Sequence, residues 1–389
     1  STKDQITIEE ITLGESLLTP GLQTSVQLYS YFQNLPIKNL DLFKNAQMNI
    51  ELERPILKDF GIQSTMNISQ VTYRLDRRHL YNNNVEDFVL HACDQTLLND
   101  AAVLVSKLWK CKTPSTVTQD VLSTCAGAKN LDIEESQPAR DYIAENIHPF
   151  QVVAQQAQAA LAGGDDPSFL HYMTYDNFGT HHFRSLKSLA KMPARYTFFH
   201  SETGLRGEAD YNSPKYRMPN AFDRPAIHFS FPCDFDLLSD KLNGIDENGN
   251  NINAGSFINP LDLAAGFLTG SGGGRMQGCA PNGNFKQSLT NKGSAQQQNG
   301  CESNVEQHLL KRQARMGLLE KDKIKFRMTV PWQPSMHVGQ LIYFIHRDKE
   351  TSSQIYGTGT YLVVAMKHNV QFGGFGTTTI DCIDANINY

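Results

Sequence analysis

Short stretches in which apolar and polar residues alternate stand near both ends of the chain, and they constrain its fold more than any other feature. Met48, Ile50 and Leu52 alternate with polar neighbours. Comparable strand-like runs cover 66–75, 340–345, 361–367 and 377–383. A period of two predicts β-strands with one buried face. Several short strands spaced by turns are typical of small antiparallel sandwiches or barrels, so both ends are predicted to be β blocks.

The middle of the chain, about 86–192, has a mixed pattern. A helix is predicted over 113–125, because a proline near its start is favourable there. A second helix is predicted over 151–162, rich in Ala and Gln and closed by paired glycines. The run 169–186 predicts a β-hairpin around a turn at 176–179. This segment is therefore expected to be an α+β unit between the two β blocks.

The composition limits the class of protein. The chain has 389 residues, of which 40% are hydrophobic and 19% charged, so it can build real cores and is not a disordered chain. At about 100–200 residues per domain, two to four domains are expected. The net charge of −5 argues against a general nucleic-acid binder. No run approaches the roughly 18–20 apolar residues that span a bilayer, so membrane insertion is not predicted.

An insertion over 234–310 interrupts the second β block. Its part 271–300 is rich in Gly, Asn and Gln and predicts a flexible loop, and 305–319 predicts a helix. The seven cysteines include no CxxC pair, which favours reduced thiols over a disulfide framework. Cys279 and Cys301 bracket the loop and could close it, an alternative that the sequence leaves open.

Basic residues follow the insertion. They are Lys311, Arg312, Arg315, Lys321, Lys323, Lys325 and Arg327. No aromatic residue is interleaved with them before Phe326, so a nucleic-acid surface is the less favoured reading. The run is interpreted as a solvated helix face or as a face that meets an acidic partner.

Two polar pairs are candidate sites. His181 and His182 are adjacent on a predicted strand, so their side chains point to opposite faces and cannot bind one metal ion together. His171 could share a face with one of them across the turn, but no third ligand is evident. Asp165 and Asp166 form a carboxylate pair, interpreted as a loop cap before a strand.

Two further patterns lack a necessary part. The glycine-rich run 270–274 has no strand–loop–helix context and no following lysine, so it does not predict a phosphate site. The run 246–250 starts like a calcium loop, but Asn251 and Phe257 stand where glycine and glutamate are needed. The sequence therefore predicts no catalytic residue, no cofactor-binding residue and no metal ligand. No cofactor and no enzymatic activity are expected.

Three stretches in a fixed order carry a resemblance to a known family. They are ITLGESLLTPGLQTSVQLYS at 11–30, the segment 88–189 with its HPFQVVAQQAQAALAG helix and THHFRSL hairpin strand, and the closing runs MHVGQLIYF, GTGTYLVVAMKHNV and TTTIDCID. In this order the chain resembles the baseplate central hub proteins of contractile-tailed, T4-like bacteriophages. Similar strands occur in the hub part of type VI secretion spike proteins.

The resemblance implies a mixed, mainly β fold of the α+β class. Two tube-like antiparallel β-barrel domains would flank an α+β domain, with a loop-rich insertion. The implied domains are 1–85 for the first barrel, 86–194 for the α+β domain, 195–233 with 311–389 for the second barrel, and 234–310 for the insertion. The two β blocks should be structurally alike, and their strand edges should pair with the next block around a ring.

The resemblance also implies a function. Three copies would form a ring that joins the threefold central spike protein to the sixfold tail tube protein, with baseplate wedge or sheath-initiator proteins as further partners. DNA would only pass through the lumen, past a wall expected to be electronegative because the chain is acidic. The implied location is the tail baseplate of the virion, assembled in the host cytoplasm. The alternatives are a hub or spike component of a tailocin or type VI-like injection machine and, less favoured, a cell-wall hydrolase.

Overall fold

The structure is a computed structural model, and strands dominate the part of the chain that it describes. The described residues are 5–31, 46–54, 64–82, 85–163, 166–200, 228–230, 312, 315–317, 319, 326–346, 357–371 and 376–385. Among these residues, helices are confined to short elements between 95 and 190 and to the residues around 315. The prediction of a mainly β fold with α+β elements is confirmed.

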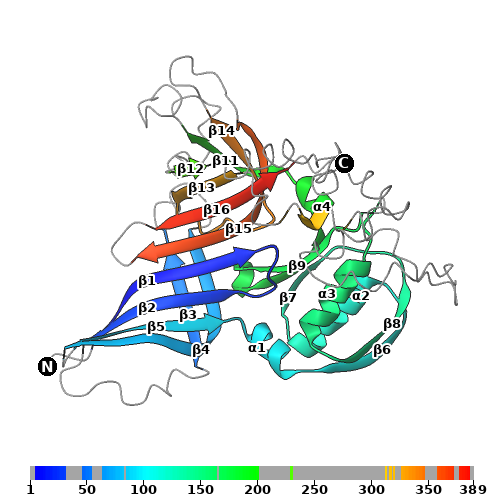
Figure 1. Ribbon diagram of the computed structural model, residues 1–389, viewed down its shortest axis with the longest axis horizontal. Coiled ribbons are helices and arrows are strands. Elements are labelled where there is room, and N and C mark those ends of the chain that lie inside the picture. The colour runs from blue at the N-terminus through cyan, green and yellow to red at the C-terminus, as the bar shows by residue number, and fades with distance from the viewer. Residues whose placement is uncertain are drawn as a thin grey trace, which may run out of the picture.

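A central sheet of eleven strands organises the molecule (Figure 1). Its first half contains β1 (Gln5–Ser16), β2 (Gln23–Tyr31), β5 (Val85–Cys93), β4 (Thr65–Asn82) and β3 (Gln47–Glu53), in that spatial order. Its second half contains β15 (Gly359–Gln371), β16 (Thr377–Asp384), β13 (Phe326–Pro331) and β12 (His228–Ser230). In addition, β14 (Leu341–His346) pairs with β15 and with β11 (Ala194–His200). The alternating runs of the sequence therefore do form strands.

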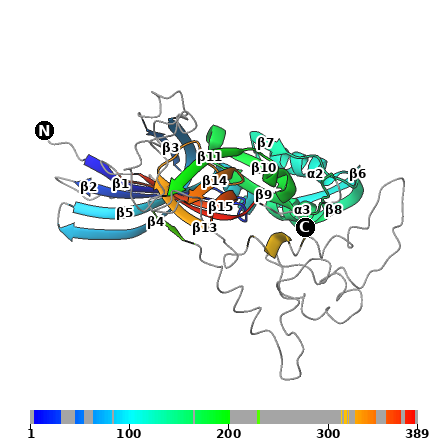
Figure 2. The ribbon, with the colours of Figure 1, turned by 90° about the horizontal axis from the view of Figure 1, so that it is seen from above.

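The two halves meet at a seam between β1 and β15. These strands pair antiparallel from Glu10 opposite Gln371 to Ser16 opposite Ala365. Outward from the seam, β1 is followed by β2, β5 and β4, and β15 by β16, β13 and β12, with every neighbouring pair antiparallel. The β11–β14 pair is parallel, which departs from the purely antiparallel expectation. The described strands thus join both blocks edge to edge in one sheet (Figures 1 and 2).

A smaller α+β unit lies beside one end of this sheet (Figure 1). Its elements are α1 (Gln95–Ala102), β6 (Val105–Lys112), α2 (Pro114–Val121), the π-helical turn η3 (Leu122–Ala126), β7 (Asn130–Ile133), β8 (Arg140–Ile147), α3 (Pro149–Ala159), β9 (Phe169–Thr174), the 3-10 turn η4 (Asp176–Phe178), β10 (Thr180–Ser185) and α4 (Leu186–Ala190). Both predicted helices and the predicted β9–β10 hairpin are confirmed. The antiparallel β6–β8 ribbon was not predicted.

Local signals explain where the two main helices begin. Thr113 caps α2 by accepting a hydrogen bond from the backbone N–H of Thr116 at 3.3 Å, and Pro114 occupies the first turn. In α3, the Gln151 side chain accepts from the backbone N–H of His148 at 3.3 Å, which closes a capping box. The apolar faces of both helices pack into one cluster with the β9–β10 hairpin. The α+β unit therefore has a core of its own.

A buried ion pair attaches the helical residues around 315 to the α+β unit. Arg315 pairs with Asp166, and these residues are 4% and 0% exposed. Arg312, 3% exposed, donates to the backbone carbonyls of Pro167 and Phe169 at 2.9 and 2.8 Å. The prediction of a solvated or partner-facing basic face is wrong for these two arginines, because their acidic partner lies in the same chain.

The cysteines differ in part from the expectation. Cys93, Cys125 and Cys382 are free thiols, whereas Cys111 is disulfide-bonded, which contradicts the expectation of reduced thiols at that position. The possible Cys279–Cys301 pair lies outside the described residues, as do the loop 271–300, the glycine-rich run 270–274 and the run 246–257. None of the described helices is both long and apolar enough to cross a lipid bilayer.

Candidate functional site

The two faces of the central sheet differ in chemistry. On β1, β2 and β5, alternate side chains such as Ile11, Leu13, Val26, Phe88 and Leu90 are buried on one face. The residues between them are mostly polar and half-buried. Since successive side chains of a strand point to opposite faces, the sheet has one apolar face and one polar face.

Strand register shows that the polar face crosses the seam. One row of opposed residues runs from β4 through β5, β2, β1 and β15 to β16. Its members are Arg74, His91, Ser25, Thr12, Asn369 and Thr377. Together with its neighbouring rows it defines the polar face: Glu10, Thr12, Gly14, Ser25, Gln27, Arg74, Asp76, Val89, His91, Arg327, Thr329, Lys367, Asn369, Gln371, Thr377, Thr379 and Asp381. Both terminal blocks therefore contribute to one continuous surface.

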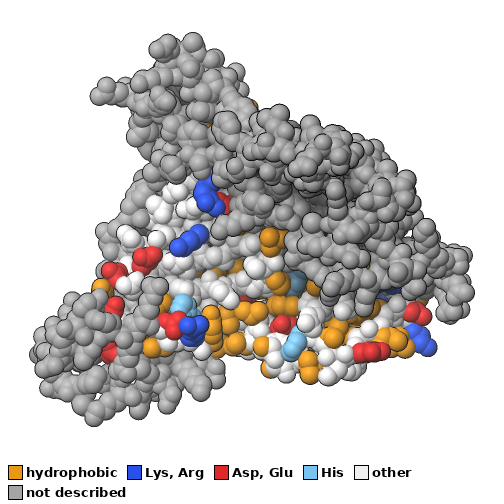
Figure 3. Space-filling model, viewed as in Figure 1, with side chains coloured by type: hydrophobic (Ala, Val, Ile, Leu, Met, Phe, Trp, Pro, Cys, Tyr) orange, Lys and Arg blue, Asp and Glu red, His pale blue; other side chains and the backbone are white. Residues whose placement is uncertain are grey.

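Most of the charges on the polar face are paired within it, and Figure 3 shows side chains of opposite charge close together on the side of the molecule seen in Figure 1. Arg327 binds Asp381 through two hydrogen bonds of 2.5 and 2.8 Å. Asp76 lies 2.8 Å from the Arg74 guanidinium and 3.2 Å from the His91 ring. Such exposed pairs contribute little to stability. Their main effect is on the charge of the face, because the paired cations neutralise carboxylates that would otherwise make it electronegative.

A Ser–His–Asp hydrogen-bond chain lies on this face, and sequence inspection missed it. Ser25 Oγ is 2.9 Å from His91 Nδ1, and His91 Nε2 is 3.2 Å from Asp76 Oδ2. The order is that of a nucleophile, a base and an orienting acid. An acyl-transfer site also needs backbone N–H groups aimed at an oxyanion. Ser25 and His91 sit opposite each other in a regular β ladder, which uses the nearby N–H groups for strand pairing. The chain therefore fits a cross-strand polar contact better than a catalytic triad.

The histidines singled out by the sequence are placed as predicted. His181 is buried at 1% exposure, and His182 points to the other side, where its Nδ1 lies 2.9 Å from Asp132. His171 shares the face of His181, with a ring-nitrogen contact of 3.0 Å. Within the described part, no group of three or more His, Cys, Asp or Glu side chains could hold a metal ion.

Hydrogen bonds determine which ring nitrogens of the buried pair His171 and His181 donate and which accept. The Thr96 hydroxyl donates to Asp94 at 2.6 Å, so it must accept from His181 Nε2 at 3.0 Å. His181 Nδ1 is then an acceptor, and His171 Nε2 donates to it. The chain ends on Asp94, which also caps α1. This arrangement links the hairpin to α1 and requires His181 to be neutral, because one of its ring nitrogens donates and the other accepts.

Acidification is expected to destabilise the protein through its buried histidines. Burial lowers the pKa of His181 to about 4 and that of His368 to about 4, and it lowers the pKa of His171 well below 6.5. Histidines with a lowered folded-state pKa contribute stability that is complete above pH 6.5 and is lost as the pH falls towards 4. His181 and His368 should each contribute on the order of 3 kcal/mol to that loss. Urea unfolding at pH 7, 6, 5 and 4 measures it, and an unchanged midpoint over this range would contradict the assignment.

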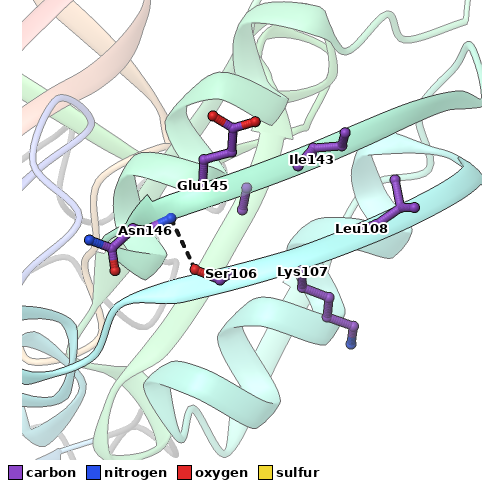
Figure 4. A pocket seen from close by; sticks show the side chains of 7 residues that line it. Ser106, Lys107, Leu108, Ile143, Glu145 and Asn146 are labelled. Atoms are coloured by element: carbon purple, nitrogen blue, oxygen red, sulfur yellow. Dashed lines mark hydrogen bonds between the residues drawn. The ribbon is translucent and has the colours of Figure 1, made fainter.

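An open depression of about 430 Å³ lies on the β6–β8 ribbon, away from the polar face (Figure 4). It is lined by Ser106, Lys107, Leu108, Ile143, Ala144, Glu145 and Asn146. Ser106 Oγ accepts a hydrogen bond from the backbone N–H of Asn146 at 3.1 Å, where a bulge interrupts the ladder. Leu108 and Ile143 stand opposite each other and are 47% and 57% exposed. This chemistry suits a contact with protein better than catalysis.

The fold, with its two joined β blocks and its lateral α+β unit, is the fold of phage tail proteins and of a type VI secretion component. No protein-family model and no curated protein sequence matches the chain. Among solved structures, a 43 kDa tail protein of prophage MuSo2 from Shewanella oneidensis matches with a TM-score of 0.52 and 9% identity, over 99% of this chain and 98% of that one. A tail protein from Neisseria meningitidis MC58 matches with a TM-score of 0.51 and 10% identity, over 99% and 98%.

A third match extends the relation to secretion. The E. coli c3393 protein matches with a TM-score of 0.53 and 7% identity, over 99% of this chain and 75% of that one. It is described as a component of the type VI secretion system with structural similarity to the T4 bacteriophage tail proteins gp27 and gp5. At these identities the likeness concerns the fold. It confirms the suspected resemblance at the level of the fold, which this chain shares with phage tail proteins and with a type VI secretion component.

Proposed function

We propose that this chain is a structural virion protein of a contractile-tailed phage, a trimeric baseplate hub that joins the central spike to the sixfold tail tube. The observation that carries the proposal is the polar face, which runs without a break across both terminal blocks. A tube wall needs a sheet with one packed face and one face suited to water. Blocks 1–85 and 195–233 with 311–389 would be the two tube-like domains, with 86–194 as a lateral domain and 234–310 as an insertion.

Symmetry explains why two blocks are needed. A threefold ring can meet a sixfold tube if each subunit offers two similar contact surfaces. The shared succession of antiparallel strands outward from the seam supports this similarity. The seam itself pairs the edges of two blocks inside one chain. Pairing between blocks of neighbouring subunits would continue the same arrangement, and it would also protect the outer strand edges from aggregation.

The polar face would line the passage for DNA. Its carboxylates Asp76 and Asp381 are paired with cations, and Glu10 and Lys367 offset each other in charge. Such a wall is closer to charge-balanced than to the electronegative wall expected from the composition. DNA would still be held only weakly by this wall, because tight phosphate binding requires many unpaired lysines and arginines. DNA would pass as cargo and would not be bound.

The purified chain is expected to form trimeric rings. Light scattering should give three times the mass of 43.5 kDa, and cryo-electron microscopy should show a threefold particle whose lumen has near-sixfold symmetry. A particle in which the polar face is buried away from the lumen, or a chain that stays monomeric at high concentration, would contradict the proposal. Within the tail, the partners would be the central spike, the tail tube and the wedge or sheath-initiator proteins.

A second candidate is the hub or spike component of a tailocin or type VI-like injection machine, which the c3393 match favours. The genes beside this one would separate the two, since only a phage needs capsid and terminase genes. A cell-wall hydrolase is less well supported, because the Ser25–His91–Asp76 chain lies in a regular β ladder. Release of soluble fragments from peptidoglycan, lost in a Ser25→Ala variant, would contradict the structural assignment.

A further inference from the structure

Arg140, the first residue of β8, is a half-buried arginine with few hydrogen-bond partners. Its guanidinium has several N–H groups, and the described residues offer them one acceptor, Gln156 Oε1, 3.3 Å from Nη2. Its Nε is buried and has no partner within the described part of the chain. Burial lowers the pKa of Arg140, and Tyr142, whose ring centre lies 5.6 Å from the guanidinium carbon, opposes this effect. The charge of Arg140 is therefore incompletely compensated.

Arg140 lacks the carboxylate partner that a buried arginine normally has. Arg315, for comparison, pairs with Asp166. Within the residues that the structure describes, Arg140 forms no such ion pair. Asp141 is next to it in sequence, but successive side chains of a strand point to opposite faces. The Asp141 carboxylate instead accepts from the backbone N–H of Cys111 at 2.7 Å. The cation of Arg140 is thus open to an anion from outside the subunit.

A second cation faces Arg140 across the ribbon. Lys112 of β6 is its direct partner in the antiparallel register, so the two side chains project from the same face. Lys112 is exposed, and no carboxylate of the described residues pairs with it. Like charges in directly opposed positions repel each other. The helix α2 begins shortly afterwards, at Pro114, and its N-terminus adds positive potential. The sequence therefore places two unpaired cations where a bound anion would relieve their repulsion.

The side chain behind the Arg140 guanidinium also has a donor without an acceptor. Gln156 is 0% exposed, and its Nε2 has no partner within the described residues. Its Oε1 already accepts from Arg140, which fixes the orientation of the amide. A buried N–H without a partner costs free energy. A water molecule could satisfy one such donor, but it would leave the two cations uncompensated. Donors from Lys112, Arg140 and Gln156 without an acceptor indicate an anionic ligand.

We propose that Lys112 and Arg140 bind a dianionic phosphate group, either free phosphate or the terminal group of a phosphate monoester. Such a group carries a charge of about −1.5 to −2 near neutral pH, which balances both cations. A carboxylate or a phosphodiester, with a single negative charge, would balance only one of them. The fork of the guanidinium also matches the oxygens of phosphate. This inference goes beyond the hub assignment and does not depend on it.

Calorimetric titration with inorganic phosphate at pH 8 and constant ionic strength tests the site. Arg140→Met removes the charge and should raise the dissociation constant at least about tenfold, because it removes charge-assisted hydrogen bonds. Lys112→Gln, at an exposed position, should raise it about threefold. Lys107→Gln is the matched control on the same strand, since Lys107 already pairs with Asp120, and should change it less than about twofold. A wild type that does not bind phosphate, or Arg140→Met and Lys107→Gln variants that bind it alike, would overturn the inference.

Melting temperatures show whether Arg140 has a merely structural role. Without phosphate, Arg140→Met should melt at the same or a higher temperature than the wild type, because it removes an unpaired charge. Phosphate should raise the melting temperature of the wild type and not that of the variant. A variant that melts lower and still gains stability from phosphate would contradict the proposal.

Two further probes identify the ligand. Acetate should bind at least about tenfold more weakly than phosphate, and equal binding would overturn the choice of a dianion. Glycerol phosphate should bind like phosphate if the ligand is a terminal monoester, whereas its loss would assign the site to free phosphate. The mass of the wild type by light scattering tests the hub assignment separately.

Discussion

Replacing Asp166 with alanine is expected to lower the free energy of unfolding by about 3–5 kcal/mol, because it leaves a buried arginine without its counter-charge. Asp166 is fully buried and pairs with Arg315, which is 4% exposed. Burial lowers the pKa of the neighbouring Arg312 to about 10, while the Asp166 carboxylate opposes that effect. The loss therefore comes from two guanidinium groups in a site with little water. Urea denaturation of the purified variant at pH 7 measures it.

Asp381→Ala is the matched control. Asp381 binds Arg327 through two hydrogen bonds, but the Arg327 side chain is 39% exposed, unlike that of Arg315. Solvent screens such a pair, so a loss of no more than about 1 kcal/mol is expected. Asp166→Ala combined with Arg315→Met removes both charges of the buried pair and should recover much of the stability. If Asp166→Ala lowers the free energy of unfolding by no more than Asp381→Ala does, the buried ion pair does not hold the helical residues around 315 in place.

Elements set by local signals could be predicted from the sequence. The helix over 149–159 has proline in its first turn and an apolar stripe, and the hairpin over 169–185 has two short strand-like runs on either side of a compact turn. The opposite facing of His181 and His182 follows from the period of a strand alone. These features depend on neighbours in sequence, and the structure confirms them.

Features that depend on distant partners could not be predicted. Arg312 and Arg315 look like a solvated basic run, and only the fold reveals that their partners are residues about 150 positions earlier. The β6–β8 ribbon could not be predicted from a period of two, because β6 is exposed at every position except Val105 and Trp109. The polar face could be read strand by strand, but its continuity required the register of β1 against β15.

Glu15 joins three parts of the chain at one buried point. Its Oε1 accepts from the backbone N–H of Tyr175 at 2.7 Å and lies 2.9 Å from His337 Nδ1, and its Oε2 accepts from the backbone N–H of Val338 at 2.9 Å. Burial alone would raise the pKa of Glu15, but the His337 imidazolium and the hydrogen bonds hold it below 4.5. Burial would lower the pKa of His337, yet Glu15 raises it above 6.5. The first block, the α+β unit and the second block thus share one buried charge pair.

Glu15→Gln is therefore expected to cost about 3–5 kcal/mol of unfolding free energy near neutral pH, since it leaves His337 without its carboxylate. Glu10→Gln, on the half-buried polar face of the same strand, should change stability by less than about 0.5 kcal/mol and serves as the control.

The effect of Glu15→Gln should depend on pH. The stabilising contribution of Glu15 is present above about pH 4.5 and is lost as the pH falls through its lowered folded-state pKa. That of His337 is complete below pH 6.5 and is lost as the pH rises through its raised folded-state pKa. The difference in unfolding free energy between the wild type and Glu15→Gln should consequently be largest between about pH 5 and 6.5 and should be smaller at pH 9. Urea midpoints of the three proteins at pH 5, 6, 7 and 9 test this, and a difference that does not vary with pH would show that Glu15 acts by packing and not as the partner of a charged histidine.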